Sequence, residues 1–218
     1  MIELLTKKIN IQKAELKKCE DREQLRIKGD LLQANLYRIS KGAMFVEVEN
    51  YYEENSPLIR IVLDPSITPA QNAQKFYKSY AKAKTAEQML KVQIEKAEQE
   101  LQYMMSVQDF LTRAQSDKEL SQIRLELVEQ GYIKEHRNSK QKAPKALPPI
   151  EFTTSDGFTV LVGRNNKQND QLTLKTAGRF DYWLHTKNIH GSHTIVMTEG
   201  KEITDTAILE AAQICAYH

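Results

Sequence analysis

The sequence predicts an α+β protein: a long antiparallel coiled-coil arm with a small β-hairpin module at its tip, then a small α/β domain. Three observations lead to this class. Apolar residues recur every three or four positions over 1–39 and 69–113, as on one face of a helix. Two short alternating segments lie between those stretches. Beyond about residue 150, the helical period gives way to short strand and helix patterns.

Residues 1–39 are predicted to form one helix. Its apolar positions start at Ile2 and continue to Ile39 after a shift of phase, and Gly42 provides a stop. No capping residue precedes Ile2, so we expect the chain to be a fragment that begins inside a helix.

Residues 43–63 are predicted to form a β-hairpin. Two alternating apolar segments flank Asn55-Ser56-Pro57, which favours a turn. Because an isolated hairpin is marginally stable in water, we expect it to pack against a helix.

A second long helix is predicted over residues 69–113. Thr68 supplies a capping oxygen, and Pro69 suits the first helical position. Eleven positions from 76 to 111 step by three or four, and only Glu87 and Gln108 among them are neither apolar nor aromatic. At about 1.5 Å per residue the helix spans roughly 65 Å, which indicates an arm that pairs with the first helix.

The remaining elements follow from capping and turn residues. Ser116 and Glu119 form a capping box for a helix over 117–130. Residues 134–149 hold five Lys or Arg and three Pro, which is typical of a flexible basic linker. Within 150–218 we expect strands at 158–162, 181–185 and 194–197, a short helix capped by Asn169-Asp170, and a helix from Asp205 that the chain leaves incomplete.

Composition limits the class of protein. The net charge is only +2, so any attraction to nucleic acid must come from local clusters. The two cysteines, Cys19 and Cys215, provide no disulfide framework and suit a reducing compartment. No apolar run approaches the length of about 20 residues needed to span a membrane, and no signal peptide is recognisable, so a cytoplasmic location is expected.

The most distinctive stretch is Asp181-Tyr182-Trp183-Leu184-His185. Alternation along a strand places Asp181, Trp183 and His185 on one face, where all three need polar partners. Such a face is either a satisfied polar core or a surface that meets a polar ligand.

Neighbouring residues admit two interpretations each. The loop from Arg164 to Asn169 can bind an anion or RNA, or it can be an ordinary solvated loop. Gly191-Ser192 can form a phosphate-binding turn or a plain turn.

Catalytic and metal sites fit the sequence poorly. The spacing of His185, His190 and His193 matches no zinc signature. Ser192 and His193 are adjacent, and adjacent residues of a strand point to opposite faces, so they do not make a nucleophile and base. We therefore expect a binding module with no metal, no cofactor and no enzymatic activity.

The motifs resemble a known family. Gly163-Arg164-Asn165-Asn166 through Asn169-Asp170, then Asp181-x-Trp183-x-His185 and Gly191-Ser192-His193, are similar to the RNA-binding NFACT-R domain. Upstream segments such as Leu63-Asp64-Pro65 and Glu126-Leu127-Val128-Glu129-Gln130-Gly131-Tyr132 resemble the coiled-coil and middle region of the RqcH/NEMF (NFACT) family. Bacterial members are often named FbpA-type fibronectin- or fibrinogen-binding proteins.

The resemblance implies a role in ribosome quality control. Such proteins bind large ribosomal subunits (50S) obstructed by peptidyl-tRNA and recruit alanyl-tRNA, so that an untemplated alanine tail is added to the stalled chain. A surface adhesin that binds host fibronectin or fibrinogen is the alternative. The family's N-terminal domain is absent from this chain, so we do not expect the chain to support tailing alone.

The resemblance also points to one RNA-binding surface, in which Arg164 contacts phosphate and Trp183 stacks or anchors. The candidate RNA-binding residues are Arg164, Asn165, Asn166, Asn169, Asp181, Trp183, His185, Gly191, Ser192 and His193.

Overall fold

The structure is a computed structural model that describes residues 1–134 and 146–218. Most of the predicted basic linker, residues 135–145, lies outside the described residues. The chain divides into two compact units, Met1–Leu101 and Gln102–His218.

The first 38 residues form two helices and a short 3-10 turn instead of the single helix predicted over 1–39. Helix α1 spans Ile2–Lys18, α2 spans Arg22–Ala34 and η1 spans Leu36–Arg38. Between α1 and α2, the Cys19 and Glu20 N–H groups donate to carbonyls three residues earlier, which tightens and ends the helix. The phase shift in the apolar pattern was the sign of this break.

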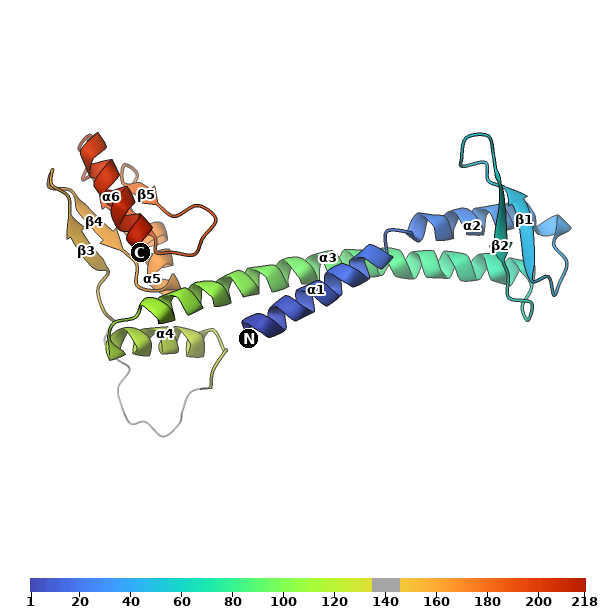
Figure 1. Ribbon diagram of the computed structural model, residues 1–218, viewed down its shortest axis with the longest axis horizontal. Coiled ribbons are helices and arrows are strands. Elements are labelled where there is room, and N and C mark those ends of the chain that lie inside the picture. The colour runs from blue at the N-terminus through green and yellow to red at the C-terminus, as the bar shows by residue number, and fades with distance from the viewer. Residues whose placement is uncertain (135–145) are drawn as a thin grey trace. The chain divides into compact units, whose positions relative to one another are not determined.

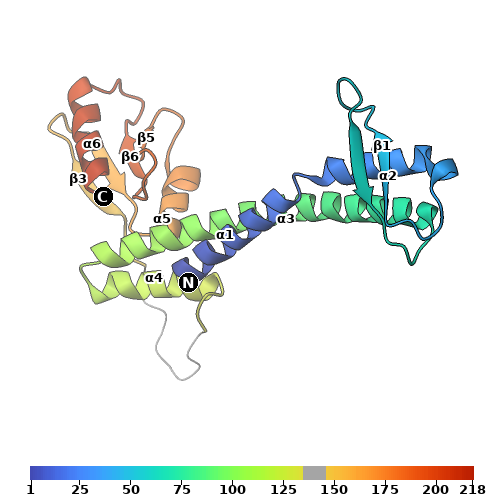
Figure 2. The ribbon, with the colours of Figure 1, turned by 45° about the vertical axis from the view of Figure 1, so that its right-hand side comes forward.

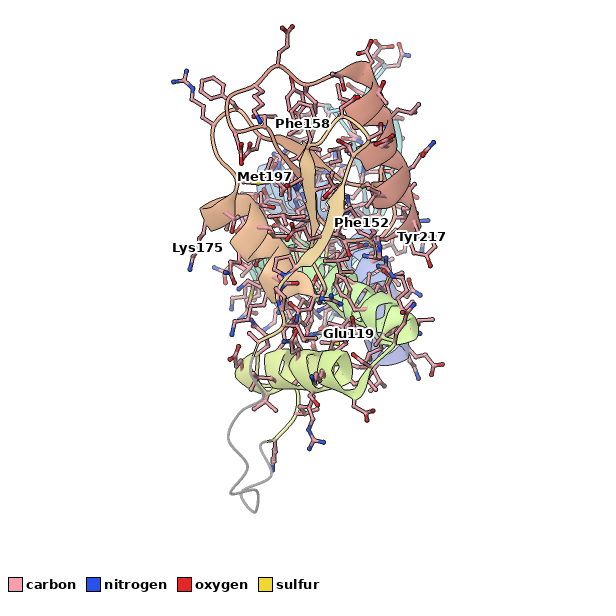
Figure 3. The ribbon with its side chains drawn as sticks, turned by 90° about the vertical axis from the view of Figure 1, so that its left-hand side faces the viewer. Glu119, Phe152, Phe158, Lys175, Met197 and Tyr217 are labelled. Carbon is pink, nitrogen blue, oxygen red and sulfur yellow. The ribbon has the colours of Figure 1, made fainter. Side chains whose placement is uncertain are left out.

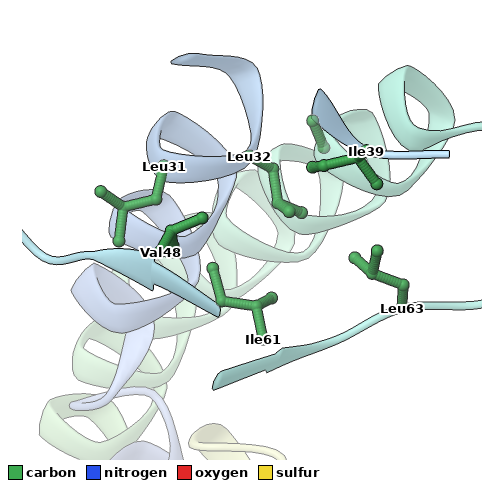
Figure 4. Packing of buried hydrophobic residues seen from close by; sticks show 7 residues of the cluster. Leu31, Leu32, Ile39, Val48, Ile61 and Leu63 are labelled. Atoms are coloured by element: carbon green, nitrogen blue, oxygen red, sulfur yellow. The ribbon is translucent and has the colours of Figure 1, made fainter. Parts of the chain in front are cut away.

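A β-hairpin packs on α2 and on the start of the long helix α3 (Pro69–Arg113). Strand β1 (Phe45–Glu49) pairs antiparallel with β2 (Leu58–Val62), in a register that sets Val48 opposite Ile59. The inward residues share one core with α2 and the start of α3, as Figure 4 shows. The buried members are Leu31, Leu32, Ile39, Val48, Ile61, Leu63 and Ala73.

Helix α3 spans Pro69–Arg113 and is capped by Thr68 as predicted, and Gln71 completes a capping box that was not predicted. The Gln71 N–H donates to Thr68 Oγ1 (3.3 Å), and the Thr68 N–H donates to Gln71 Oε1 (2.9 Å). Within the first unit α1 runs antiparallel to α3 (Figure 1). Lys13 pairs with Glu98 at 2.6 Å and Arg22 pairs with Glu87, so partners farther along α1 and α2 lie earlier on α3.

The predicted apolar seam of α3 changes phase near its end. Gln108 and Leu111 were predicted to lie in the seam but are exposed, whereas Val107 and Phe110 are buried. The reason is a change of partner, because Val107 and Phe110 pack against Ile123 of α4 (Asp117–Glu129) in the second unit.

The second unit contains a four-stranded antiparallel sheet in the order β3-β4-β6-β5. The strands are β3 (Ile150–Thr153), β4 (Thr159–Val162), β5 (Tyr182–Leu184) and β6 (Thr194–Met197). Helix α6 (Asp205–Tyr217) covers one face, where Ala207 and Ala211 pack on Val160 and Val196 (Figure 2).

Helix α5 (Asn166–Gln171) and the π-helical turn η2 (Leu172–Thr176) lie toward the other face. The cap of α5 is Asn165, whose side chain accepts from the Gln168 N–H (2.9 Å), so the predicted Asn169-Asp170 cap is wrong. A side-chain oxygen was available at both places, but only Asn165 has the extended backbone that a cap requires.

Both cysteines are buried free thiols. In the part of the chain that the structure describes, no helix is both long and apolar enough to cross a membrane.

Candidate functional site

An aromatic cluster of Trp183, His185 and His193 lies at the β5 edge of the sheet. The indole of Trp183 stacks on the imidazole of His185, with ring centres 5.8 Å apart and planes at 7°. His193 meets both rings edge-on, at 5.3 Å from Trp183 and 5.4 Å from His185. The indole remains 51% exposed, so the cluster presents an aromatic surface to solvent.

Strand pairing sets the direction of Trp183. Trp183 pairs with Ile195, which pairs with Leu161, so these residues form one row on the face opposite α6. Tyr182 and Leu184 point the other way, and Leu184 contributes to the core beneath α6. The predicted alternation along this strand is confirmed.

A hydrogen-bonded scaffold fixes His193. Its backbone N–H donates to Asn169 Oδ1 at 3.0 Å, and its ring Nδ1 is hydrogen-bonded to Thr173 Oγ1 at 2.7 Å. Asn169 Nδ2 donates to the Gly191 carbonyl at 3.5 Å. A side chain on Gly191 would meet Thr186 Oγ1 at 2.8 Å, so any larger residue in the turn before His193 would have to displace Thr186.

Burial lowers the pKa of His193, and the nearby charge of His185 lowers it further. Asp170 and the Asn169 hydrogen bond oppose the shift without cancelling it. His193 is therefore neutral at pH 7, so its ring meets Trp183 and His185 edge-on without carrying a charge.

Asp181 supports the end of β5 and takes no part in the aromatic cluster. Its carboxylate accepts from the N–H groups of Thr198 (2.7 Å) and Gly178 (2.8 Å). The polar partners expected for Asp181 are thus two backbone N–H groups.

Arg164 lies in a second group of contacts, toward α4. Its guanidinium forms a salt bridge with Glu119 and donates through Nε to the Pro148 carbonyl at 2.9 Å. Burial favours the neutral form of Glu119, but the Gln115 N–H and the charge of Arg164 outweigh it and lower the pKa of Glu119. Glu119 is labelled on α4 in Figure 3.

Asn166 and Lys167 extend this group along α4. Asn166 Nδ2 donates to Glu126 Oε1 (3.2 Å), and Lys167 Nζ donates to both oxygens of Glu129 (2.9 and 2.6 Å). We call Arg164, Asn166 and Lys167, with their α4 partners Glu119, Glu126 and Glu129, the ionic edge.

The other two predicted residues are buried. Asn165 caps α5, and Ser192 is 3% exposed, with its N–H donating to the His218 carbonyl at 3.2 Å. The structure therefore divides the single predicted surface into the aromatic cluster, the ionic edge and the buried groups that hold them.

Sequence reasoning missed several residues of the site. Thr173 was not singled out because its contact with His193 depends on how η2 packs. Lys187 and Lys175 are exposed cations near the cluster in sequence, two residues after His185 and Thr173 respectively. Figure 3 shows Lys175 pointing away from the sheet.

A stacked aromatic pair exposed at the edge of a small sheet is the kind of surface with which RNA-binding proteins hold unpaired bases. Comparison with known proteins agrees with this class. A family model of the NFACT N-terminal and middle domains matches residues 1–146. A model of the NFACT protein RNA binding domain matches residues 149–218. The chain belongs to the NFACT family, as its motifs indicated.

Two curated relatives are similar over most of this chain. An Rqc2 homolog RqcH from Bacillus subtilis (strain 168) is 41% identical over 200 residues, which are 91% of this chain and 35% of that protein. An Rqc2 homolog RqcH from Streptococcus suis (strain 05ZYH33) is 39% identical over 212 residues, 97% of this chain and 37% of that protein. The chain thus spans little more than a third of these relatives.

A solved structure shares the fold. It is the C-terminal part of the fibronectin/fibrinogen-binding protein from Streptococcus suis (FBPS), with a TM-score of 0.73 and 32% sequence identity. The match covers 99% of this chain and 72% of that chain. The α+β class predicted from the sequence is confirmed.

Proposed function

We propose that this chain is part of a ribosome quality control factor. In this role it binds obstructed large ribosomal subunits (50S) carrying peptidyl-tRNA, binds tRNA, and supports untemplated alanine tailing of stalled nascent chains. The family membership and the relatives named Rqc2 homolog RqcH support it. Such work takes place in the cytoplasm, and the chain acts as a binding module without catalysis of its own.

The exposed indole of Trp183 carries the proposal. Its stack on His185 leaves the indole half exposed, where an unpaired base can extend the stack. Neutral His193 holds the other two rings in place without adding a charge that would require solvation. RNA backbone then passes the exposed cations Lys175 and Lys187.

Trp183→Ala tests this role. We expect the variant to bind tRNA and peptidyl-tRNA-carrying 50S subunits about tenfold more weakly or worse, since one base stack is lost. The slope of affinity against salt should stay unchanged because no cation is removed. Fluorescence anisotropy with labelled tRNA and co-sedimentation with 50S subunits measure the two affinities.

Tyr182→Ala is the matched control. Tyr182 is the adjacent residue of β5, is 47% exposed, and lies on the opposite face. It should keep the affinity of the unchanged chain. Equal affinities for the Trp183 and Tyr182 variants, with both folded, would remove the aromatic cluster from the RNA site.

Binding of host fibronectin or fibrinogen, with display at the cell surface, is the second candidate. The similar Streptococcus suis structure supports it, as does the exposed face of the hairpin. There, Phe45, Leu58 and Val62 are exposed, and the guanidinium of Arg60 lies 3.7 Å from the centre of the Phe45 ring. Immobilised fibronectin and fibrinogen should capture the chain, and Val62→Lys should abolish the capture, if this face binds them.

A further inference from the structure

Three carboxylates of α4 meet the first two side chains of α5 and Arg164, which precedes the cap of α5. Glu119 pairs with Arg164, Glu126 accepts from Asn166, and Glu129 accepts from Lys167. Along α4 they are spaced by seven and three residues, which brings them to one side of a helix. This side of α4 presents a line of anionic oxygens to the RNA-binding domain.

The central carboxylate is held most firmly. Glu126 is 4% exposed and accepts from the Tyr103 hydroxyl at 2.9 Å as well as from Asn166. The Lys167 N–H also approaches Glu126 Oε2 at 3.5 Å. Burial, and then the hydrogen bond to Glu126 and the charge of Glu126, raise the pKa of Tyr103, so this hydroxyl stays a donor.

Apolar packing contributes little to this contact. The cluster of Val107, Phe110 and Ile123 joins α3 to α4, and the cluster beneath α6 lies within the sheet domain. Among the described residues, no hydrophobic cluster contains members of both α4 and the domain of residues 149–218. The ionic edge is therefore an electrostatic contact, which another polyanion can replace.

We propose that α4 is an internal competitor of RNA: its three carboxylates occupy the places that backbone phosphates take on Arg164, Asn166 and Lys167. Lys167 is exposed, but RNA reaches the partly buried Arg164 and Asn166 only when α4 is displaced. The inference rests on the proposed RNA-binding function and adds a second contact region with its own regulation. Guanidinium, amide and ammonium donors suit phosphate oxygens as well as carboxylates.

Neutralising the three carboxylates tests the inference. In the full 218-residue chain, Glu119→Gln, Glu126→Gln and Glu129→Gln together should bind tRNA about tenfold more tightly, because three competing contacts are weakened. Glutamine keeps an acceptor for the Tyr103 hydroxyl, so the unit should still fold. Circular dichroism and thermal unfolding check the fold.

The control changes the net charge equally without touching the contact. Glu15, Glu20 and Glu95 are exposed acids for which no ion pair is formed among the described residues. Glu15→Gln, Glu20→Gln and Glu95→Gln together should change the affinity for tRNA less than twofold (roughly, from long-range charge alone).

A second measurement detects displacement directly. Adding tRNA to the unchanged chain should speed amide hydrogen exchange in α4, which loses its partner on α5. Arg164→Ala should then weaken binding and reduce the salt slope more in the triple-glutamine background than alone, since Arg164 is engaged by Glu119 in the unchanged chain.

The outcomes separate the inference from the function beneath it. If the unchanged chain binds tRNA through Trp183 but the triple variant binds no more tightly, the inference is overturned and the proposed function stands. If neither chain binds tRNA or 50S subunits, both are overturned. Tighter binding with faster exchange in α4 supports the inference.

Discussion

The aromatic cluster and the ionic edge both lie in the second unit, and they differ in what covers them. Trp183 is half exposed, and every partner that positions it belongs to the sheet domain. Arg164 has the stronger charge but is bound by Glu119, which is 45 residues away in sequence. The difference shows that the residue type best suited to bind phosphate need not be the one available to it.

Gly163→Ala should have the largest effect on stability. Gly163 precedes Arg164 of the ionic edge, and its N–H donates to the carbonyl of His193 in the aromatic cluster. A methyl group there would lie 1.9 Å from Asn169 Oδ1 and 3.2 Å from the Asn169 backbone nitrogen. Displacing Asn169 releases His193, so we expect a loss of about 3 kcal/mol in the free energy of unfolding. Urea denaturation measures it.

Gly157→Ala is the comparison for that substitution. A methyl group at Gly157 meets no atom within 4 Å, and only its φ of +84° is unfavourable, at about 1 kcal/mol. Similar losses for both variants would show that Asn169 does not link the two regions.

Asp181→Ala should distinguish residues that stabilise the fold from residues that contact RNA. It deprives the N–H groups of Thr198 and Gly178 of their acceptor, which should cost about 2 kcal/mol of stability. Below the unfolding temperature the affinity for tRNA should not change, since Asp181 touches no ring of the cluster. Asp170→Ala is the control, because Asp170 is exposed and its removal should leave stability nearly unchanged. A tenfold loss of tRNA affinity in folded Asp181→Ala would instead place Asp181 in the contact surface.

Acidification should weaken the aromatic cluster first and the ionic edge only at lower pH. The change in stability should be smaller than for Gly163→Ala or Asp181→Ala. The pKa of His193 is lowered from 6.5, so below pH 6.5 the unfolded chain binds more protons than the folded chain. The free energy of unfolding should fall by about a few tenths of a kcal/mol as the pH drops from 6.5 through the folded pKa of His193. The loss is small because solvent screens a partly buried imidazole.

The ionic edge should persist over that interval. The pKa of Glu119 is lowered from 4.5, so its contribution is lost only as the pH falls through its still lower folded value. His218 also has a lowered pKa, caused by burial and then by Arg113 and Arg164, and adds to the first phase. His193→Gln should reduce the loss between pH 6.5 and 5.5, and an unchanged titration would contradict this assignment.

Local rules were enough to predict much of the fold. Thr68-Pro69, Ser116 with Glu119, and Thr204 each cap the helix expected after them. The period of two along β5 predicted that Trp183 and Leu184 face opposite ways. These features depend on residues within a few positions of one another.

The features that were not predicted depend on residues distant in sequence. The break between α1 and α2 shows in sequence only as a shift of phase, and the end of the α3 seam changes because α4 replaces the earlier partner. The convergence of His193 on Trp183 and His185 needs the pairing of β5 with β6. The salt bridge of Arg164 with Glu119 has no local signal at all.

The two buried thiols have a practical consequence. Because Cys19 and Cys215 are both shielded, a single cysteine introduced at an exposed position such as Lys118 of α4 would react first with a maleimide dye. The chain therefore needs no cysteine removal before spectroscopic labelling, and a dye at this position would show in real time whether tRNA displaces α4.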